Sequence, residues 1–423
     1  MRVTFSVDPK QLKEHHIMST SFLYHTQGVK GFQFQSFDYS GGRVAARITR
    51  KPGTFFCPEC GAYHTTPTYT GERTIKALPM GSKDFVLQVA MHRIRCHRCA
   101  AFRMEPLPFL PSAKARVTRS LARSIIELRG NMSIIDLAAH FNLHWTTVKN
   151  IEKKYLKKKF KRIRLRDVRW IGVDEVHVGN RLGEKGFITV VRDMKSGAVL
   201  HVGKGRGGDA LKDFTRRVKH SKCKIEAVAM DFSPAYKAWA AQFFPKATLV
   251  FDHFHLIKLM NDKIDTIRRR IMSRLEENDK KALKYKRWHF LRNQEGLDAD
   301  AEAELHKCRE QFEELGTAWY MKESLRRIYS LAWDADSAAL AFDRWCELAD
   351  ATNISQLHTM ARTIRRNIDG ITAYWTTGMT SASMEGFNNK IRWLNSQAYG
   401  YHDEEYFLLK VFDLPYVKNR RDL

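Results

Sequence analysis

The chain opens with short stretches in which apolar and polar residues alternate, and helical spacing follows them. GFQFQSFDY and RVAARITR, joined by Ser40-Gly41-Gly42, predict a β-hairpin with Phe32 and Phe34 on one face. FVLQVAMHRIR predicts a further strand. In VTRSLARSIIELRG, which ends at Gly130, the apolar residues recur at the spacing of an amphipathic helix. The chain is therefore expected to pass from a β-rich part into helices.

A short turn separates two predicted helices in the next stretch. The first spans Ser133 to His140, the turn lies around Asn142-Leu143, and the second begins near His144 to Thr146. The apolar positions that would pack together are Ile134, Leu137, Ala138, Leu143, Val148 and Ile151. This pattern favours a helix-turn-helix, whose second helix would present five side chains to the DNA major groove: Trp145, Thr146, Thr147, Lys149 and Asn150. The basic run from Lys153 to Arg166 would then either track phosphates or form a solvated linker.

A mixed α/β sheet is predicted between residues 166 and 255. WIGVDEVHV, from Trp170 to Val178, KGFITVVRD and AVLHVGKGR predict three consecutive strands. A helix at GDALKDFTRRVKH, a strand at IEAVAMD, a helix at PAYKAWAAQFF and a strand at ATLVFDHFH follow. This order matches a ribonuclease-H-like core, in which the first and fourth strands are neighbours. Asp174 and Asp231 fall on those two strands.

The charge balance indicates the kind of partner, because the chain has 72 Lys and Arg residues and 46 Asp and Glu residues. Its formal net charge is +26. Such an excess repels itself unless a polyanion neutralises it, so nucleic acid is the first expected partner and an anionic membrane the second. No run approaches 18 apolar residues, and MRVTFSVDPKQLKEHH lacks a signal-peptide core. A soluble cytoplasmic protein associated with the nucleoid is expected, and membrane binding is not.

Four of the seven cysteines form two close pairs, Cys57 with Cys60 and Cys96 with Cys99. Two thiolates on a tight turn can share a tetrahedral zinc ion, and a second such pair completes a closed structural site. One structural Zn²⁺ is therefore expected, and the alternative is four unliganded core cysteines. The other three lie apart and are expected to be free thiols: Cys223, Cys308 and Cys346.

Asp174 lies within an apolar, β-branched strand, where a buried carboxylate costs several kcal/mol unless a partner offsets it. Three acids that converge from two strands and a helix can hold two magnesium ions, which suit in-line displacement at phosphorus. Asp174, Asp231 and Glu385 fit this arrangement. Taken singly, an Asp at a strand end is more often a turn former, and a Glu in a first helical turn often complements the helix dipole. Glu175 is expected on the opposite face of the strand.

The motifs together resemble the DDE transposases of bacterial insertion sequences, in the IS-L-three family. The resemblance covers nearly the whole chain, with the two Cys pairs, the LPMG turn at 78–81, the helix-turn-helix and the core. The most specific match is SMEGFNNKIRWLNSQAYGYHDEEYF, with its E-G-x-N-N-x-I centre. The resemblance implies that Asp174, Asp231 and Glu385 are the catalytic triad. It also marks Asp252 and His255 in FDHFH as active-site support, although such a His is as often a packing or capping residue.

The length of 423 residues exceeds one ordinary core, and the chain is expected to be a multidomain α+β protein. Its parts would be a hairpin and zinc-binding domain (1–112), a helix-turn-helix with a basic linker (113–165), the first part of the core (166–255), an all-helical insertion (256–375) and the last part of the core with Glu385 (376–423).

The predicted function is that of a DNA transposase that binds the terminal inverted repeats of its element and catalyses metal-dependent strand cleavage and transfer into target DNA. Two Mg²⁺ ions would serve catalysis, and Mn²⁺ can substitute. Because two ends must be held, a homodimer or higher oligomer on DNA is expected. One alternative is a catalytically inactive DNA-binding regulator derived from a transposase. Another is a ribonuclease-H-like structure-selective nuclease, although such enzymes rarely carry sequence-reading modules at the N-terminus.

Overall fold

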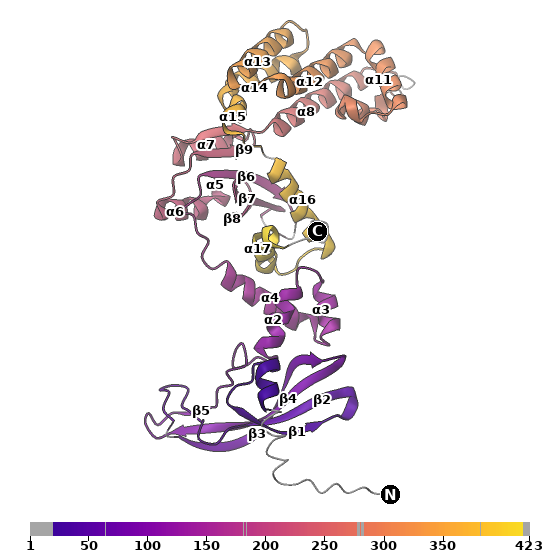
Figure 1. The fold of residues 1–423 in the computed structure, drawn as a ribbon. Helices are drawn as coiled ribbons and strands as arrows, with labels where there is room; N and C mark the ends of the chain where they lie inside the picture. The colour runs from indigo at the N-terminus through magenta and orange to yellow at the C-terminus, as the bar shows by residue number, and fades with distance from the viewer. Residues whose placement is uncertain are drawn as a thin grey trace. The chain divides into compact units, whose positions relative to one another are not determined.

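The computed structural model describes residues 20–63, 65–180, 182, 184–276, 280, 283–380 and 382–417 (Figure 1). The predicted absence of a signal peptide concerns the first 16 residues, which lie outside these ranges. The described chain divides into two compact units. One comprises the residues up to Lys159 together with Val417, and the other is Phe160–Tyr416. Among the helices described, none has the length and apolar character needed to cross a membrane.

The first unit is built on a five-stranded sheet whose order is β1-β2-β4-β3, with β5 paired to β4. The predicted hairpin is confirmed, because β1 (Phe32–Asp38) pairs antiparallel with β2 (Arg43–Arg50). The predicted strand at 85–95 is part of β4 (Lys83–Cys96). The strand that sequence reasoning missed is β3 (Thr65–Met80), which pairs antiparallel with β4, and β5 (Phe102–Met104) is also additional. The threonines and the tyrosine of β3 favour a strand, although buried and exposed residues alternate only weakly along its exposed first half.

A buried ion pair joins this sheet to the segment that follows the second cysteine pair. Arg50 Nε lies 2.6 Å from Glu105 Oε2, and their side chains are 3% and 0% exposed. Glu105 Oε1 also accepts hydrogen bonds from the backbone and ring nitrogens of His92. The Arg50 guanidinium lies over the Phe32 ring at 4.7 Å. Because each charge is paired and hydrogen-bonded, the desolvation of both groups is offset.

Three helices complete the first unit, and two of them form the predicted helix-turn-helix. They are α2 (Arg119–Leu128), α3 (Ile134–His140) and α4 (Trp145–Lys159). Ser133 and Asp136 form a capping box at the start of α3. Leu137, Ala138 and Val148 are buried, and the other predicted apolar positions pack against them. The basic run from Lys153 to Arg166 begins within α4, because Lys153–Lys159 continues this helix.

The second unit contains a mixed sheet of order β10-β9-β6-β7-β8. Its strands are β6 (Trp170–His177), β7 (Phe187–Asp193), β8 (Val199–Lys204), β9 (Ala227–Met230) and β10 (Thr248–Phe251). The first three form an antiparallel meander, and β6, β9 and β10 run parallel. The predicted neighbourhood of the first and fourth strands is therefore confirmed. The predicted position of Asp231 inside the fourth strand is wrong by one residue, because β9 ends at Met230.

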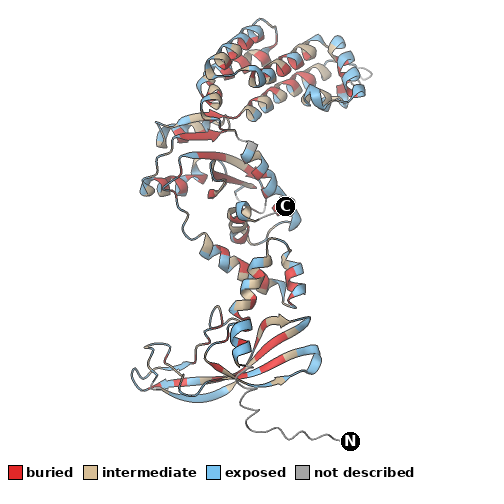
Figure 2. Ribbon diagram, viewed as in Figure 1, coloured by how far each residue is buried: buried red, intermediate tan, exposed pale blue. Residues whose placement is uncertain are grey.

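Helices cover both faces of this sheet. One face packs on α6 (Lys212–Ser221) and α7 (Pro234–Phe243), where Phe214, Tyr236 and Trp239 are buried with Ile171 and Val173. The other packs on α16 (Ala382–Gln397), which lies against β6, and α17 (Glu404–Asp413), which lies against β8 (Figure 1). Figure 2 shows that the strands between these layers are largely buried.

The predicted single helix at 208–220 is wrong, because two helices occupy the segment. A short helix, α5 (Gly207–Ala210), precedes α6, and Leu211 separates them with φ −100° and ψ −3°. The Ala210 carbonyl lies 2.8 Å from the buried His201 ring nitrogen of β8. The Ala210 carbonyl thus bonds to a side chain, whereas in a continuous helix it would accept a backbone hydrogen bond from the next turn.

Helices form the described part of the chain between residues 253 and 377, where no strand occurs. They are α8 (His253–Met272), α10 (Arg287–Leu291), η2 (Gln294–Gly296), α11 (Ala299–Gln311), α12 (Glu313–Leu331), α13 (Ala335–Asp350), α14 (Ser355–Arg366) and α15 (Ile368–Thr377). Their buried side chains continue the apolar cluster of the α6 and α7 face. Gly370 allows α15 to approach β10, because a Cβ there would collide with the Phe251 ring.

The buried Arg50–Glu105 pair makes the first unit sensitive to a single deletion. We expect Glu105→Ala to lower the free energy of unfolding of this unit by about 3–5 kcal/mol, because Arg50 would remain buried and unpaired. Urea unfolding of the full chain, followed by circular dichroism, measures the change. The matched control is Glu127→Ala, which removes an exposed pair with Arg123 and should cost less than about 1 kcal/mol. Equal effects of the two substitutions would contradict the assigned role of the buried pair.

Candidate active site

Asp174 lies in β6, where the alternation of the strand decides which layer each side chain meets. Ile171 and Val173 pack with α6 and α7, whereas Val176 packs with α16 and α17. Asp174 shares the face of Val176, since side chains two residues apart in a strand point the same way. A Cβ at Gly172, on this face, would meet Met384 of α16 at 3.0 Å. Glycine at this position therefore lets α16 lie close to the strand that carries the acid.

The Asp174 carboxylate is half-buried and accepts two hydrogen bonds. Its Oδ1 accepts from the backbone N–H of Glu175 at 2.8 Å, and its Oδ2 accepts from Asn388 Nδ2 of α16 at 2.6 Å. Burial raises the pKa of the Asp174 carboxyl above its ordinary value, and the Asp231 carboxylate adds to this rise. The charge of His255 and the two hydrogen bonds act in the opposite direction.

Asp231 follows the end of β9, the strand that runs parallel to β6. Gly172 pairs with Ala229 in this ladder, so Asp174 and Asp231 each lie two residues beyond the same paired position. Asp231 Oδ1 accepts a hydrogen bond from the backbone N–H of Ser233 at 2.9 Å, at the start of α7. The topology thus brings together two acids that lie far apart in the sequence, and their charges interact.

Asp252 and His255 lie at the start of α8, beside these two acids. Asp252 is buried, and its Oδ2 lies 3.7 Å from His255 Nδ1. Burial opposes the charged form of His255. The nearby carboxylates of Asp252, Asp174 and Asp231 outweigh it, and the pKa of His255 is raised above its ordinary value. The His255 ring therefore faces the same group of acids, which favour its charged form.

Glu385 lies in the first turn of α16 and is half-buried. It precedes Asn388 by three residues, so the two side chains lie on neighbouring positions of one helix face. Within the described ranges, the three predicted acids do not bring their oxygens within 4.8 Å of one another, as the four cysteines do with their sulfurs. Like charges repel without a cation between them. The donors are nevertheless all oxygens, which suit a hard divalent ion.

Glu175 lies on the opposite face of β6, as predicted. Its Oε1 accepts a hydrogen bond from the buried Tyr236 hydroxyl at 2.7 Å, and its Oε2 lies 3.4 Å from Arg206 Nε. These partners belong to the α5 and α7 side of the sheet. Glu175 is therefore held away from the α16 face that carries Asp174.

Arg192 of β7 anchors the start of α16, and sequence reasoning did not identify it. Its Nη1 donates to the Ser383 carbonyl at 2.6 Å, and its Nη2 donates to the Gly197 carbonyl at 2.9 Å. The guanidinium also lies 4.3 Å from the centre of the Phe387 ring. Burial lowers the pKa of Arg192. The available signal was a single arginine in the otherwise apolar strand FITVVRD.

The four paired cysteines meet in the first unit. Their sulfurs all lie within 4.8 Å of one another, and the Cys57–Cys99 and Cys60–Cys96 distances are both 3.6 Å. The backbone N–H of Glu59 donates to Cys57 Sγ, and that of Arg98 donates to Cys96 Sγ. The pKa of the Cys96 thiol is lowered to about 6, chiefly by the backbone N–H of Cys99. Four converging sulfurs with N–H donors suit a tetrahedral zinc ion.

The five predicted DNA-reading residues lie in the first two turns of α4. Trp145 is 49% exposed and Asn150 is exposed, while Thr146, Thr147 and Lys149 are half-buried. Asn142, in the turn before α4, has φ +47° and donates its amide to Asp84 Oδ2 of β4 at 2.6 Å. This contact ties the turn of the helix-turn-helix to the sheet of the same unit.

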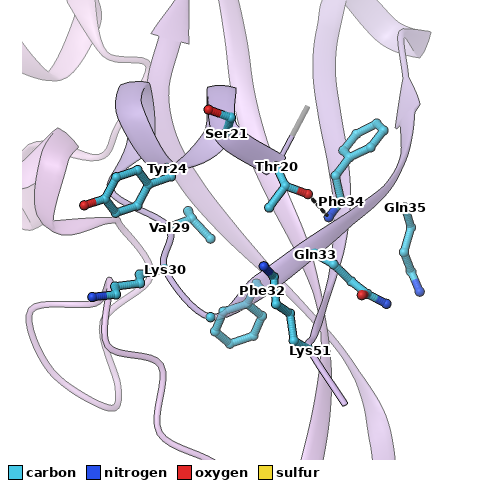
Figure 3. Close-up of a pocket in the computed structure, with 11 residues that line it drawn as sticks. Thr20, Ser21, Tyr24, Val29, Lys30, Phe32, Gln33, Phe34, Gln35 and Lys51 are labelled. Atoms are coloured by element: carbon cyan, nitrogen blue, oxygen red, sulfur yellow. Dashed lines mark hydrogen bonds between the residues drawn. The ribbon is translucent and has the colours of Figure 1, made fainter. Parts of the chain in front are cut away.

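A pocket of about 760 Å³ lies in the first unit between the helix at residues 20–27 and β1. Figure 3 shows Tyr24, Phe32, Phe34 and Lys51 among its lining residues, and Thr20 accepts a hydrogen bond from the Phe34 N–H. None of the predicted acids or cysteines lines it in the described part of the chain. This pocket is therefore separate from the acids and cysteines that the sequence analysis selected.

Two family models match the chain. One is described as a transposase of the ISL3 group and matches residues 171–411. The other is described as the helix-turn-helix domain of transposase family ISL3 and matches residues 105–156. The first match spans β6 to α17 and contains the three predicted acids, while the second contains α2, α3 and most of α4.

Similar proteins carry the same description. The transposase for insertion sequence element IS1001 of Bordetella parapertussis is 30% identical over 364 residues, which cover 84% of this chain and 87% of that protein. The transposase for IS1557 of Mycobacterium tuberculosis is 24% identical over 409 residues, 89% of this chain and 90% of that protein. Among solved structures, the Drosophila P element transposase strand transfer complex matches with a TM-score of 0.37 and 10% identity, over 72% of this chain and 92% of that chain.

The cysteine cluster predicts that zinc supports the fold of the first unit. We expect Cys57→Ser to lower the bound zinc to well below one ion per chain and to lower the unfolding temperature of this unit. The physical reason is that binding of a structural zinc contributes about 10–16 kcal/mol in small domains. Elemental analysis and calorimetry of the full chain measure both effects. Cys223→Ser, outside the cluster, is the control. Unchanged thermal unfolding after removal of metal with a chelator would count against a structural ion.

Proposed function

Because the chain belongs to the ISL3 family of transposases and is a DNA transposase of the DDE type, we propose that Asp174, Asp231 and Glu385 are its catalytic acids. One observation carries this proposal: Asp174 and Asp231 lie at corresponding positions of neighbouring parallel strands, and α16 bonds to Asp174 one turn after Glu385. An acid from each of three elements thus belongs to one face of the sheet.

The DDE family implies the use of divalent metal ions, and the oxygen donors of this site fit them. We propose that Asp174, Asp231 and Glu385 would hold two Mg²⁺ ions, for which Mn²⁺ can substitute. Bound ions would activate the attacking oxygen and stabilise the leaving one. The protein's own contribution is to hold three carboxylates on rigid elements, where the hydrogen bonds from Glu175 and Asn388 orient Asp174.

The proposed reaction has two steps at phosphorus. In the first, water attacks the phosphodiester at the element end, the bond to the 3′ oxygen breaks, and a free 3′ hydroxyl and a 5′ phosphate result. In the second, this 3′ hydroxyl attacks a target phosphodiester, and the leaving 3′ oxygen of the target takes up a proton. The number of phosphodiester bonds is conserved in the second step. The mechanism requires no covalent intermediate with the protein.

We propose that Asp252 and His255 support this site. His255 interacts with the charges of Asp174 and Asp231, and the buried Asp252 lies within 3.7 Å of its ring. In its charged form, which the acids favour, the His255 imidazole would reduce the mutual repulsion of the two carboxylates. Asp252 would fix the orientation of the ring at the start of α8.

We propose that the sheet with its two helical layers is a ribonuclease-H-like core, and that residues 256–375 are an all-helical insertion within it. The order of the strands supports this, because a three-stranded antiparallel meander precedes two parallel strands. The core would then end with 376–423, which carries Glu385. The helical segment would contribute protein contacts or grip flanking DNA.

We propose that the first unit recognises the terminal inverted repeats of the element. Residues 113–165 would read the major groove through α4, and the zinc-binding domain (1–112) would support them. The helix-turn-helix match and the net charge of +26 support DNA binding. Since transposition joins two ends to one target, a homodimer or higher oligomer would assemble on DNA.

The triad predicts separable effects on chemistry and on binding. We expect Asp174→Asn to lower Mg²⁺-dependent cleavage of end DNA below detection, because the neutral amide cannot replace the carboxylate as a ligand of two cations. Binding of end DNA should stay within a few-fold of the unchanged protein, since Asp174 lies outside the first unit. Gel assays of cleavage and mobility shift on the same end fragment measure the two. Cleavage at an unchanged rate would show that the assignment is wrong.

Base contacts and phosphate contacts of α4 can be distinguished by how DNA binding depends on base sequence and on salt concentration. We expect Asn150→Ala to lower the preference for end DNA over unrelated DNA by about 1–3 kcal/mol, because a base contact is lost. Lys158→Ala, at the basic end of α4, should weaken binding to end DNA and to unrelated DNA equally. It should also reduce the slope of the logarithm of the binding constant against the logarithm of salt concentration by about one. Fluorescence anisotropy on both duplexes at several salt concentrations gives these values. An unchanged preference for Asn150→Ala would remove this residue from the reading surface.

A further inference from the structure

Asn388 is among the most deeply buried polar residues of the second unit. It lies in α16, and only 3% of it is exposed. It follows Glu385 by three residues, which places both side chains on neighbouring positions of one helix face. Sequence reasoning assigned it no role in the chemistry. A buried amide needs partners for its two donors and its acceptor, so its contacts indicate what the site provides.

The contacts of the Asn388 amide are unequal. Nδ2 donates to Asp174 Oδ2 at 2.6 Å. The reverse orientation would place two acceptor oxygens in contact, so the chemistry decides which end faces Asp174. Oδ1, at the other end of the same planar group, is buried and accepts no hydrogen bond from any residue that the structure describes. A buried acceptor without a donor costs roughly 1–3 kcal/mol, which calls for a partner of another kind.

The contacts recorded for this amide lead to acids through its other end, Nδ2. Asp174 bonds to the same amide, and the Asp231 carboxylate acts on Asp174. Ionised carboxylates have no proton to donate, so they cannot satisfy an acceptor. A divalent cation or a water molecule held by one can do so, and amide oxygens belong to the ligands that hard cations accept.

We propose that Asn388 is a fourth residue of the divalent-cation site, in which Oδ1 supplies an oxygen ligand while Nδ2 holds Asp174 in place. This inference rests on the proposed role of Asp174 and extends it to a neutral ligand from the helix of Glu385. A neutral oxygen adds a ligand without adding to the repulsion among three carboxylates. Asp174 would be bound at the Nδ2 end of the planar amide of Asn388, and the cation at its Oδ1 end.

The adjacent residue provides a matched control. Asn389 has the same side chain on the same helix but is exposed, and its Oδ1 accepts a hydrogen bond from Arg392 Nη1 at 2.6 Å. Loss of the Asn389 amide therefore removes an equal volume and helix preference without touching the acids. If Asn388→Ala and Asn389→Ala have different effects, the position of Asn388 beside the acids is the cause, because the two substitutions remove the same side chain.

The experiment measures binding of Mn²⁺ to the full chain, without DNA, by the electron paramagnetic resonance signal of the free ion. We expect Asn388→Ala to weaken Mn²⁺ binding by about tenfold or more. Asn388→Asp, which keeps an oxygen at the position, should retain affinity within a few-fold. Asn389→Ala should match the unchanged protein. Circular dichroism checks that each variant is folded, and Asn388→Asp, with its unchanged volume, serves where alanine disrupts the helix.

Each outcome bears on one proposal. Unchanged Mn²⁺ affinity in Asn388→Ala overturns the inference. So does Asn388→Asp as weak as Asn388→Ala, because only the N–H bond to Asp174 would then matter. Asp174→Asn in the same assay tests the proposed function separately. If that variant binds Mn²⁺ normally, the metal assignment of Asp174 fails, whereas weak binding there together with normal binding in Asn388→Ala rejects the inference alone.

Discussion

The hydrogen bond between Asn388 and Asp174 joins the last long helix of the second unit to the first strand of its sheet. An acid in an apolar strand is tolerated only when its charge is compensated, and here the compensation comes from a distant part of the chain. Arg192 secures the same helix at its start through the Ser383 carbonyl, and Asn395 donates to the Val178 carbonyl further along. These contacts hold α16, which carries Glu385, against the strand that carries Asp174.

The first unit meets a different constraint, because its apolar cluster contains far fewer buried residues than the main cluster of the second unit. Its apolar cluster is small, and two polar devices supplement it. One is the group of four cysteines, which closes the turns after Phe56 and after β4. The other is Glu105, which binds both Arg50 and His92 just after the second cysteine turn. The contacts of Glu105 hold their segments in place directly, and the four sulfurs would do the same with a bound zinc ion. Such contacts can supplement a small core.

The cluster of four cysteines and the helix-turn-helix were predictable because each is a local pattern with a single spacing. The meander, the parallel strands and the neighbourhood of β6 and β9 followed from the order of apolar runs. The first half of β3 was not predicted because it is exposed on both faces. A strand without a buried face shows little alternation of apolar and polar residues. The break at Leu211 escaped because its cause, a contact of the Ala210 carbonyl with His201, lies in another strand.

The sequence by itself indicated most of the elements, the family and the acids that we propose as catalytic, because period, cysteine spacing and the E-G-x-N-N-x-I motif are properties of neighbouring residues. It also separated Asp174 from Glu175, since alternation along a strand is local. Only the tertiary structure decided which groups surround Asp174. Asn388 lies 214 residues away from it in the chain, and Arg192 lies 191 residues from Ser383. No local period encodes such contacts, because they arise when the sheet and α16 bury their apolar faces together.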